Sequence, residues 1–275
     1  MKGGNVVSEA NEITHSPSGE QKIEIYKIGS PSANSVTPLP LVVSLLPSIN
    51  CPLPNAPMSS RFPPVDTADE DGLLAVGGKL TPDWLIDAYT HGIFPWPMNE
   101  DYPITWFSPD PRAILPLDEA HFSRRLLRTI RHKNWIYRID TAFVDVIYGC
   151  AADRDDEPGT WITSKMIDAY CEMHRLNFAH SFEVWEPSSD GEASTPPKLI
   201  GGVYGLAFNR FFAGESMFHT VTDASKAALW FLVKTLKEKG FILFDLQVIN
   251  DHTRQFGTIE IPRAEYLQRL KEALR

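Results

Sequence analysis

Two long apolar runs, at residues 199–208 and 211–218, are separated only by Asn209-Arg210. Runs that are rich in aromatic and apolar residues favour strands, and an asparagine between two such runs is typical of a tight turn. The segment therefore predicts a β-hairpin. Any fold of this chain has to accommodate that hairpin, so the other elements are placed around it.

Segments on either side of the hairpin extend the predicted sheet. Residues 181–185 alternate as a strand, and residues 241–248 read as a buried strand. Between the hairpin and the last strand, a helix is expected to begin at a capping Asp223 and to end at Gly240. Three antiparallel strands, a helix and a further strand predict an α+β domain with one mainly antiparallel sheet.

The part before this sheet reads as helices and a small N-terminal α/β domain. Helices are predicted for residues 123–133 and for residues 164–176, the second behind a capping Thr163. In the small domain, a short helix begins at Thr81-Pro82-Asp83 and ends at Gly92. The apolar segments around that helix are expected to be loops: residues 71–78, 93–96 and 105–109.

The first 60 residues mix Ser, Pro, Asn and Gly without sustained periodicity. Such a segment buries too little apolar surface to offset the entropy of ordering, so a disordered extension is predicted. Met58 directly precedes the first patterned segment, which raises the hypothesis that translation starts there. The predicted division is therefore an extension at residues 1–60, a small domain at 61–112 and the main domain at 113–275.

Composition excludes several classes of protein. No apolar run approaches the roughly 20 residues that cross a bilayer, and no basic stretch precedes an apolar one as in a signal peptide. The three cysteines and eight histidines lack metal-binding spacing, so we expect no metal and no cofactor. A formal net charge of −9 argues against indiscriminate nucleic-acid binding, although a local basic stripe can still hold phosphates. A cytoplasmic protein without membrane contact is predicted.

The strand predicted at residues 241–248 carries two polar side chains. Asp245 and Gln247 are two residues apart, so a strand projects both to one face, roughly 6–7 Å apart. One interpretation is a structural hydrogen-bond pair, because buried polar groups need partners. The other is a functional pair that faces a shared substrate. Both interpretations are open from the pattern alone.

Three further residues are candidates for a binding site. Glu215 lies among apolar residues, so it is either paired with a basic side chain or aimed at a cationic or hydrogen-bond-donating ligand. Trp96 and Trp161 both lie in predicted loops. A base stacked on such a ring gains roughly 1–3 kcal/mol, so the tryptophans can hold an unpaired nucleotide. The alternative is that each fills the contact between two domains.

The helix predicted at residues 123–133 is basic on one side. Arg124, Arg128 and Arg131 follow i, i+4, i+7 spacing, and no acidic residue lies between His121 and Lys133. Guanidinium groups suit phosphates, so the stripe favours contact with RNA. The alternative is an ordinary solvated helix face, but such faces normally mix both signs of charge.

In this order, the segments resemble the leucyl/phenylalanyl-tRNA-protein transferase family. The resemblance spans about residues 62–266 and is carried by Gly72-Leu-Leu-Ala-Val-Gly-Gly, Gly92-Ile-Phe-Pro-Trp, Trp106-Phe-Ser-Pro-Asp-Pro-Arg, His121-Phe-Ser-Arg, Gly159-Thr-Trp-Ile-Thr, Ala179-His-Ser, Gly214-Glu-Ser-Met-Phe, Asp223-Ala-Ser-Lys and Asp245-Leu-Gln. It implies an acetyltransferase-like (GNAT-like) catalytic domain. It also implies leucyl- or phenylalanyl-tRNA as the donor and proteins with N-terminal Arg or Lys, marked for N-degron proteolysis, as acceptors.

The resemblance also assigns residues to roles, and a monomer is expected. The assigned residues are Asp245 and Gln247 as the catalytic pair, Trp96, Trp161, Glu215, Val203 and Phe212 as substrate-binding, and Arg124, Arg128 and Arg131 as tRNA-binding. Val203 stands where relatives often have methionine, and His219 stands where serine is usual. The preference among leucine, phenylalanine and methionine is therefore open, because one methylene in an apolar pocket discriminates by only about 1–3 kcal/mol.

Two other classes of function remain open. An acyl-CoA-dependent N-acetyltransferase would use the same implied fold, and fold alone does not decide function. Its pyrophosphate-binding loop has a nearest match at residues 254–259, which lacks the last small residue. The other alternative is a non-catalytic RNA-binding module, in which Asp245 and Gln247 would be incidental.

Overall fold

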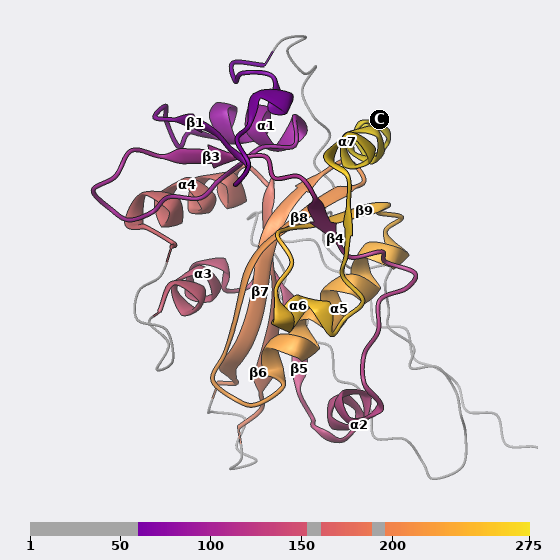
Figure 1. The fold of residues 1–275 in the computed structure, drawn as a ribbon. Coiled ribbons are helices and arrows are strands. Elements are labelled where there is room, and N and C mark those ends of the chain that lie inside the picture. The colour runs from indigo at the N-terminus through magenta and orange to yellow at the C-terminus, as the bar shows by residue number, and fades with distance from the viewer. Residues whose placement is uncertain (1–59, 153–160, 189–195) are drawn as a thin grey trace, which may run out of the picture.

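The computed structural model describes residues 60–152, 161–188 and 196–275. Residues 1–59 of the predicted extension lie outside this part, as do Gly159 and Thr160 of one motif and most of the proline- and serine-rich loop near residues 187–197. The described chain forms a small sheet of three strands and a large sheet of seven (Figure 1). No helix in these ranges is long and apolar enough to cross a membrane.

Three short antiparallel strands make the small sheet, in the order β1-β3-β2. They are β1 (Leu73–Val76), β2 (Phe94–Pro95) and β3 (Thr105–Phe107), and helix α1 (Pro82–Thr90) lies between β1 and β2 in the chain. The prediction of loops here was wrong, because all three strands come from segments expected to be loops. Strands of two to four residues are too short to show alternation, so the sequence pattern did not reveal them.

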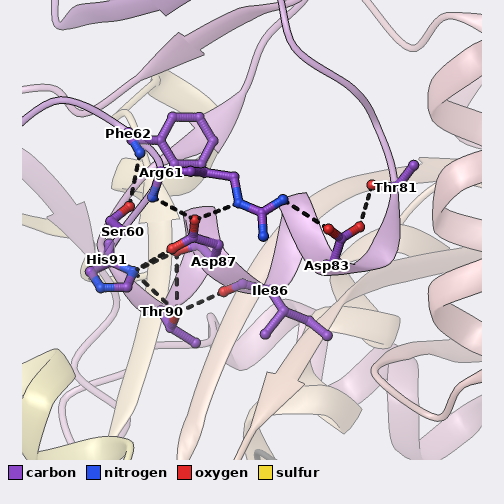
Figure 2. A network of polar contacts seen from close by, with 9 residues as sticks. All are labelled: Ser60, Arg61, Phe62, Thr81, Asp83, Ile86, Asp87, Thr90 and His91. Atoms are coloured by element: carbon purple, nitrogen blue, oxygen red, sulfur yellow. Dashed lines mark hydrogen bonds and ion pairs between the residues drawn. The ribbon is translucent and has the colours of Figure 1, made fainter. Parts of the chain in front are cut away.

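Helix α1 is fixed to the start of the described chain by a polar network (Figure 2). Asp87 is buried, and its Oδ2 atom accepts from both the backbone nitrogen and Nε of Arg61 at 3.0 Å. The same arginine reaches Asp83 through Nη1 at 2.8 Å, and Nδ1 of His91 lies 3.0 Å from the other Asp87 oxygen. These contacts hold the helix that carries Tyr89 toward the candidate site.

The large sheet has the order β10-β4-β9-β8-β7-β6-β5, and its neighbours are antiparallel except for the parallel pair β8–β9. Its strands are β4 (Arg112–Ile114), β5 (Ile136–Ile139), β6 (Ala179–Glu186), β7 (Lys198–Phe208), β8 (Phe211–His219), β9 (Leu243–Gln247) and β10 (Ile259–Ile261). The predicted hairpin is β7–β8, and Asn209 in its turn has the left-handed φ of 50° that asparagine tolerates. The prediction of a mainly antiparallel sheet is confirmed.

Helices cover both faces of the large sheet. They are α2 (Arg124–His132), α3 (Phe143–Ala151), α4 (Ser164–Arg175), α5 (Ala224–Glu238), α6 (Asp251–Arg254) and α7 (Arg263–Ala273). Figure 1 shows α3 and α4 on one side of the sheet and α5 on the other, and a hydrophobic core lies under each. The helices expected at 123–133 and 164–176 are confirmed, and Ser123 and Thr163 cap them with their side chains.

Two local predictions around α5 need correction. Asp223 stands at the N-cap position, but its φ of 71° is left-handed and its side chain makes no capping hydrogen bond. The strand expected over residues 241–248 is shorter in the structure, where β9 spans Leu243–Gln247. Ile242 before it is exposed, and Gln247 at its end leaves the extended conformation with a φ of 58°. Gly240 ends α5 as predicted, with a φ of 77°.

Candidate active site

Two adjoining pockets lie where β9 ends and the small sheet meets the large one. The first has a volume of about 370 Å³ and is lined by Phe94, Pro95, Trp96, Trp161, Glu215, Leu246, Gln247, Val248, Ile249 and Asn250. The second, of about 230 Å³, is lined by Trp161, Val203, Gly214, Glu215, Ser216, Met217, Leu229, Phe244, Leu246, Gln247, Asn250, His252 and Thr253. Five residues line both: Trp161, Glu215, Leu246, Gln247 and Asn250.

The first pocket has an aromatic wall. The rings of Trp96 and Trp161 meet edge to face, with centroids 6.4 Å apart, and Phe107 lies 5.9 Å from Trp96. Trp96 is 41% exposed, so a ligand can reach its face. The two tryptophans, predicted independently from separate loops, thus line the same pocket, and the exposed ring of Trp96 offers a face on which a flat ligand can stack.

The second pocket has apolar residues on one part of its wall and polar residues on the rest, among them Ser216, His252 and Thr253. Val203 lies on its wall, as predicted, together with Met217 and Phe244. Phe212 is placed differently from the prediction, because it is fully buried and lines neither pocket. Its ring packs against Phe182 at 6.0 Å and Phe244 at 5.7 Å, so it supports the pocket wall from behind.

Glu215 stands at the junction of the two pockets with hydrogen-bond partners from three elements. Its Oε1 accepts from the Tyr89 hydroxyl at 2.7 Å and from Gln247 Nε2 at 3.4 Å, and its Oε2 accepts from the Tyr170 hydroxyl at 3.1 Å. No Arg or Lys in the described ranges forms an ion pair with it. Burial raises the pKa of Glu215 to about 7, although the two tyrosine hydrogen bonds act in the opposite direction.

Asp245 lies behind the pockets in a fully buried ion pair. Its two oxygens accept from Nε and Nη2 of Arg112 at 2.9 and 2.7 Å, and Tyr266 donates to Oδ2 at 2.9 Å. The remaining guanidinium nitrogen, Nη1, donates to the carbonyl of Gly92 at 3.0 Å. Asp245 lines neither pocket, and its lone pairs are occupied by groups of the protein.

Gln247 and Asp245 do not share one open face, contrary to the strand pattern. The left-handed backbone of Gln247 turns its side chain toward Glu215, and Asp245 Oδ1 accepts from the backbone nitrogen of Gln247 at 2.9 Å. The hydrogen bond expected between the Gln247 side-chain amide and Asp245 is therefore replaced by one through the backbone. Asp245 fixes the main chain that presents Gln247 to both pockets.

The predicted arginine stripe lies on α2, which Figure 1 shows at the opposite end of the molecule from the small sheet. Arg124, Arg128 and Arg131 are all exposed, and none forms an ion pair with a residue in the described ranges. The opposite side of the helix is buried through Leu126 and Ile130. The helix therefore presents three unneutralised guanidinium groups to solvent.

Sequence reasoning missed the groups that hold Glu215 and Asp245 in place. Tyr89, Tyr170 and Tyr266 are buried helical tyrosines that carry no local motif. Arg112 ends one of the family motifs and stood at the predicted domain boundary. Because a buried Asp needs a charged partner, this arginine could have been proposed as the partner of Asp245.

The fold and site define a class: an α+β protein with two adjoining pockets, one with an aromatic wall, that share Glu215 and Gln247. Residues 114–271 match the family model described as leucyl/phenylalanyl-tRNA protein transferase, and residues 78–110 match that of its N-terminal domain. The chain therefore belongs to the leucyl/phenylalanyl-tRNA protein transferase family, which confirms the resemblance carried by the motifs.

Similar proteins cover most of the chain. It is 47% identical over 215 residues to a leucyl/phenylalanyl-tRNA–protein transferase of Nitratidesulfovibrio vulgaris, covering 78% of this chain and 88% of that protein. The corresponding protein of an Anaeromyxobacter species is 49% identical over 219 residues, covering 79% and 89%. A solved domain of a putative lysylphosphatidylglycerol synthetase from Agrobacterium fabrum covers 62% of this chain and 54% of that one, at 12% identity and a TM-score of 0.34, which is too weak to support an argument.

Proposed function

We propose that this chain transfers leucine or phenylalanine, with methionine as a further donor, from aminoacyl-tRNA to the N-terminal Arg or Lys of acceptor proteins. The product is a new peptide bond, which marks the acceptor for N-degron proteolysis. The observation that carries the proposal is the pair of pockets joined at Glu215 and Gln247, because an aminoacyl ester has the same division into a nucleoside and an amino-acid side chain.

The two pockets divide the donor between them. The terminal adenosine stacks on the wall of Trp96 and Trp161, because base-aromatic stacking is favourable for any base. The amino-acid side chain enters the second pocket on its apolar wall, beside Val203 and Met217. The ester that links the two parts then lies at the residues common to both pockets, next to Gln247.

Gln247 and Asp245 take different roles in this arrangement. The Gln247 amide lies at the pocket junction, where it can hydrogen-bond to the ester or to the incoming amine. Asp245 acts through it as a positioning residue, because it holds the Gln247 backbone and is itself buried against Arg112. Catalysis of this kind rests on orientation and on hydrogen bonds to developing charge, and it needs no covalent enzyme intermediate.

The finer fold assignment is also part of the proposal. We assign residues 113–275 to the acetyltransferase-like (GNAT-like) class, supported by the parallel pair β8–β9 in an otherwise antiparallel sheet and by pockets at the end of β9. An acyl-CoA site is less well supported, since the segment at residues 254–259 closes the four-residue α6 and runs into strand β10. It does not open a helix whose N-terminus could hold a pyrophosphate.

The proposed activity predicts that a peptide beginning with Arg gains one leucine when mixed with this protein and leucyl-tRNA. Mass spectrometry of the peptide measures the addition. The same peptide with an acetylated N-terminus is the control, since it has no free amine to attack the ester. Addition of an acetyl group from acetyl-CoA, without leucine transfer from leucyl-tRNA, would contradict the proposal in favour of an acetyltransferase.

The arginine stripe on α2 predicts that binding of the tRNA body weakens as the salt concentration rises. Replacing Arg124, Arg128 and Arg131 by Ala should weaken tRNA binding and flatten its dependence on salt, by about 0.7–0.9 in the log–log slope for each phosphate that is no longer neutralised. Binding is measured at several salt concentrations. The matched control removes three positive charges elsewhere, at Arg175, Arg269 and Lys271. Equal slopes in the stripe variant and the control would show that α2 does not meet the tRNA.

A further inference from the structure

Three oxygen-bearing side chains meet beside the pocket junction. The hydroxyls of Tyr89 and Tyr170 lie 2.5 Å apart, and each lies within hydrogen-bond distance of one oxygen of Glu215, at 2.7 and 3.1 Å. Both tyrosines are buried, and burial is the main reason why their pKa values are well above the usual 10. Both hydroxyls therefore keep their protons.

A count of protons shows which form of Glu215 the cluster suits. Three oxygen-oxygen contacts each need one hydrogen, but two tyrosine hydroxyls supply only two. When Glu215 is ionised, both hydroxyls can point at the carboxylate, and their mutual contact is left without a hydrogen. When Glu215 is protonated, its own hydrogen completes a closed ring. The cluster thus holds ionised Glu215 with two hydrogen bonds, and it can take up one proton on Glu215 without losing a contact.

We propose that Glu215 accepts the proton that the α-ammonium group of the acceptor must lose before its nitrogen attacks the aminoacyl ester. This inference rests on the proposed function and adds a catalytic residue to it. The attacking nitrogen has to reach the ester, which lies where the two pockets meet. Of the five residues that line both pockets, Glu215 alone carries an ionisable side chain.

Other ionisable groups around Glu215 are less suited to take this proton. His252 of α6 lines the second pocket only, so it does not lie at the junction where the ester is proposed to lie. Tyr89 on α1, Tyr170 on α4 and Tyr204 on β7 are all buried and have pKa values well above 10. On the remaining side, Asp245 of β9 and Arg112 of β4 are paired with each other and line neither pocket. Gln247 of β9 contacts Glu215 but is a poor base.

The step balances without any further reactant. The ammonium group gives one proton to the Glu215 carboxylate, and the free amine forms a bond to the ester carbonyl carbon. The bond from that carbon to the tRNA oxygen breaks, and the second proton of the nitrogen ends on the released tRNA hydroxyl. The neutral carboxyl group of Glu215 then loses its proton to water in the open pocket.

The pH dependence of transfer tests this role. An N-terminal amine has a pKa of about 7.7–8.0, so the productive pair of ionised Glu215 and ammonium acceptor exists mainly between about 7 and that value. The kcat/KM for an Arg-peptide, with leucyl-tRNA saturating, should therefore rise as Glu215 ionises and then level off, because the ammonium form reacts through Glu215 and the free amine reacts above its own pKa. It should fall as pH drops below about 7 because Glu215 becomes protonated.

Two variants separate this role from simple binding. Glu215→Gln should lower kcat/KM most below the pKa of the amine, by roughly fivefold near pH 7, where only about a tenth to a fifth of the amine is free. Its profile should rise through the pKa of the amine and then stay flat, because only free amine reacts. Tyr89→Phe removes a hydrogen bond that lowers the pKa of Glu215, so the acid limb should move to higher pH. Tyr137→Phe is the matched control, because it removes a buried hydroxyl that lacks a hydrogen-bond partner among the described residues.

Three other results would contradict, in turn, the role of Glu215, the role of the tyrosines and the proposed function. Transfer to the Arg-peptide with the same profile shape in the wild type and in Glu215→Gln would remove Glu215 from proton transfer and leave the proposed function intact. An acid limb in Tyr89→Phe that stays in place or moves to lower pH, while Tyr170→Phe behaves likewise, would overturn the statement that the two tyrosine hydrogen bonds stabilise ionised Glu215. Absence of leucine transfer by the wild type at any pH would instead overturn the proposed function itself.

Discussion

Replacement of Arg112 by methionine should lower the free energy of unfolding by about 3–5 kcal/mol. Arg112 and Asp245 are 1% and 0% exposed as side chains, and the guanidinium also lies over the rings of Phe94 at 4.7 Å and Tyr266 at 4.5 Å. Removing the arginine leaves a buried carboxylate with a single side-chain donor, the hydroxyl of Tyr266. Urea unfolding of the variant and the wild type measures the difference.

A matched control shows whether burial is the cause. Arg269 forms an ion pair with Glu265 in which both side chains are about 45% exposed, so Arg269→Met should cost no more than about 1 kcal/mol. The double variant Arg112→Met/Asp245→Leu should recover much of the loss, because it removes both buried charges. If Arg112→Met were as stable as Arg269→Met, the buried pair would not stabilise the fold in the way its burial implies.

Replacement of Gln247 by alanine should lower turnover by about a hundredfold or more, with donor affinity nearly unchanged. The reason is that the amide lies at the pocket junction and hydrogen-bonds to charge that develops only in the transition state. Single-turnover transfer with saturating leucyl-tRNA and Arg-peptide measures the effect. Gln268→Ala, at an exposed position on α7, is the control and should transfer at the wild-type rate.

The left-handed backbone at Gln247 calls for a second variant. Alanine is disfavoured at a φ of 58°, so part of the loss in Gln247→Ala could come from a shifted main chain. Gln247→Asn keeps a residue that tolerates this conformation and withdraws the amide by one methylene. A comparable loss in both variants assigns the effect to the amide. Near-normal turnover in Gln247→Asn and in Gln247→Ala would remove this residue from the mechanism.

Asp245 and Gln247 show what a strand pattern can predict and what it leaves open. The alternation of residues 242–248 identified two polar residues in an apolar strand, and it left open whether they are structural or functional. The structure places the two residues in different surroundings. Asp245 is buried against Arg112, which is 133 residues away in the chain, and Gln247 lines the pockets. A contact over that separation leaves no trace in local periodicity.

The sequence by itself determined the β7–β8 hairpin, the mainly antiparallel sheet, helices α2 and α4, the capping Thr163 of α4, and the family. These follow from local chemistry: apolar runs, turn residues, caps and short motifs all act within a few residues of the chain. Trp96, Trp161 and Glu215 were identified from local patterns and Val203 from the family resemblance, and all four line a pocket.

Only the tertiary structure decided how these parts meet. It pairs the short strands β1, β2 and β3, which are too short for a sequence pattern to reveal. It also places Phe212, which was predicted to bind substrate, in the core. It also brought Tyr89 and Tyr170 to Glu215 across 126 and 45 residues. The physical reason is the same in each case: burial and hydrogen bonding between distant segments depend on how whole sheets and helices pack, and burial in turn raises the pKa of Glu215 to about 7.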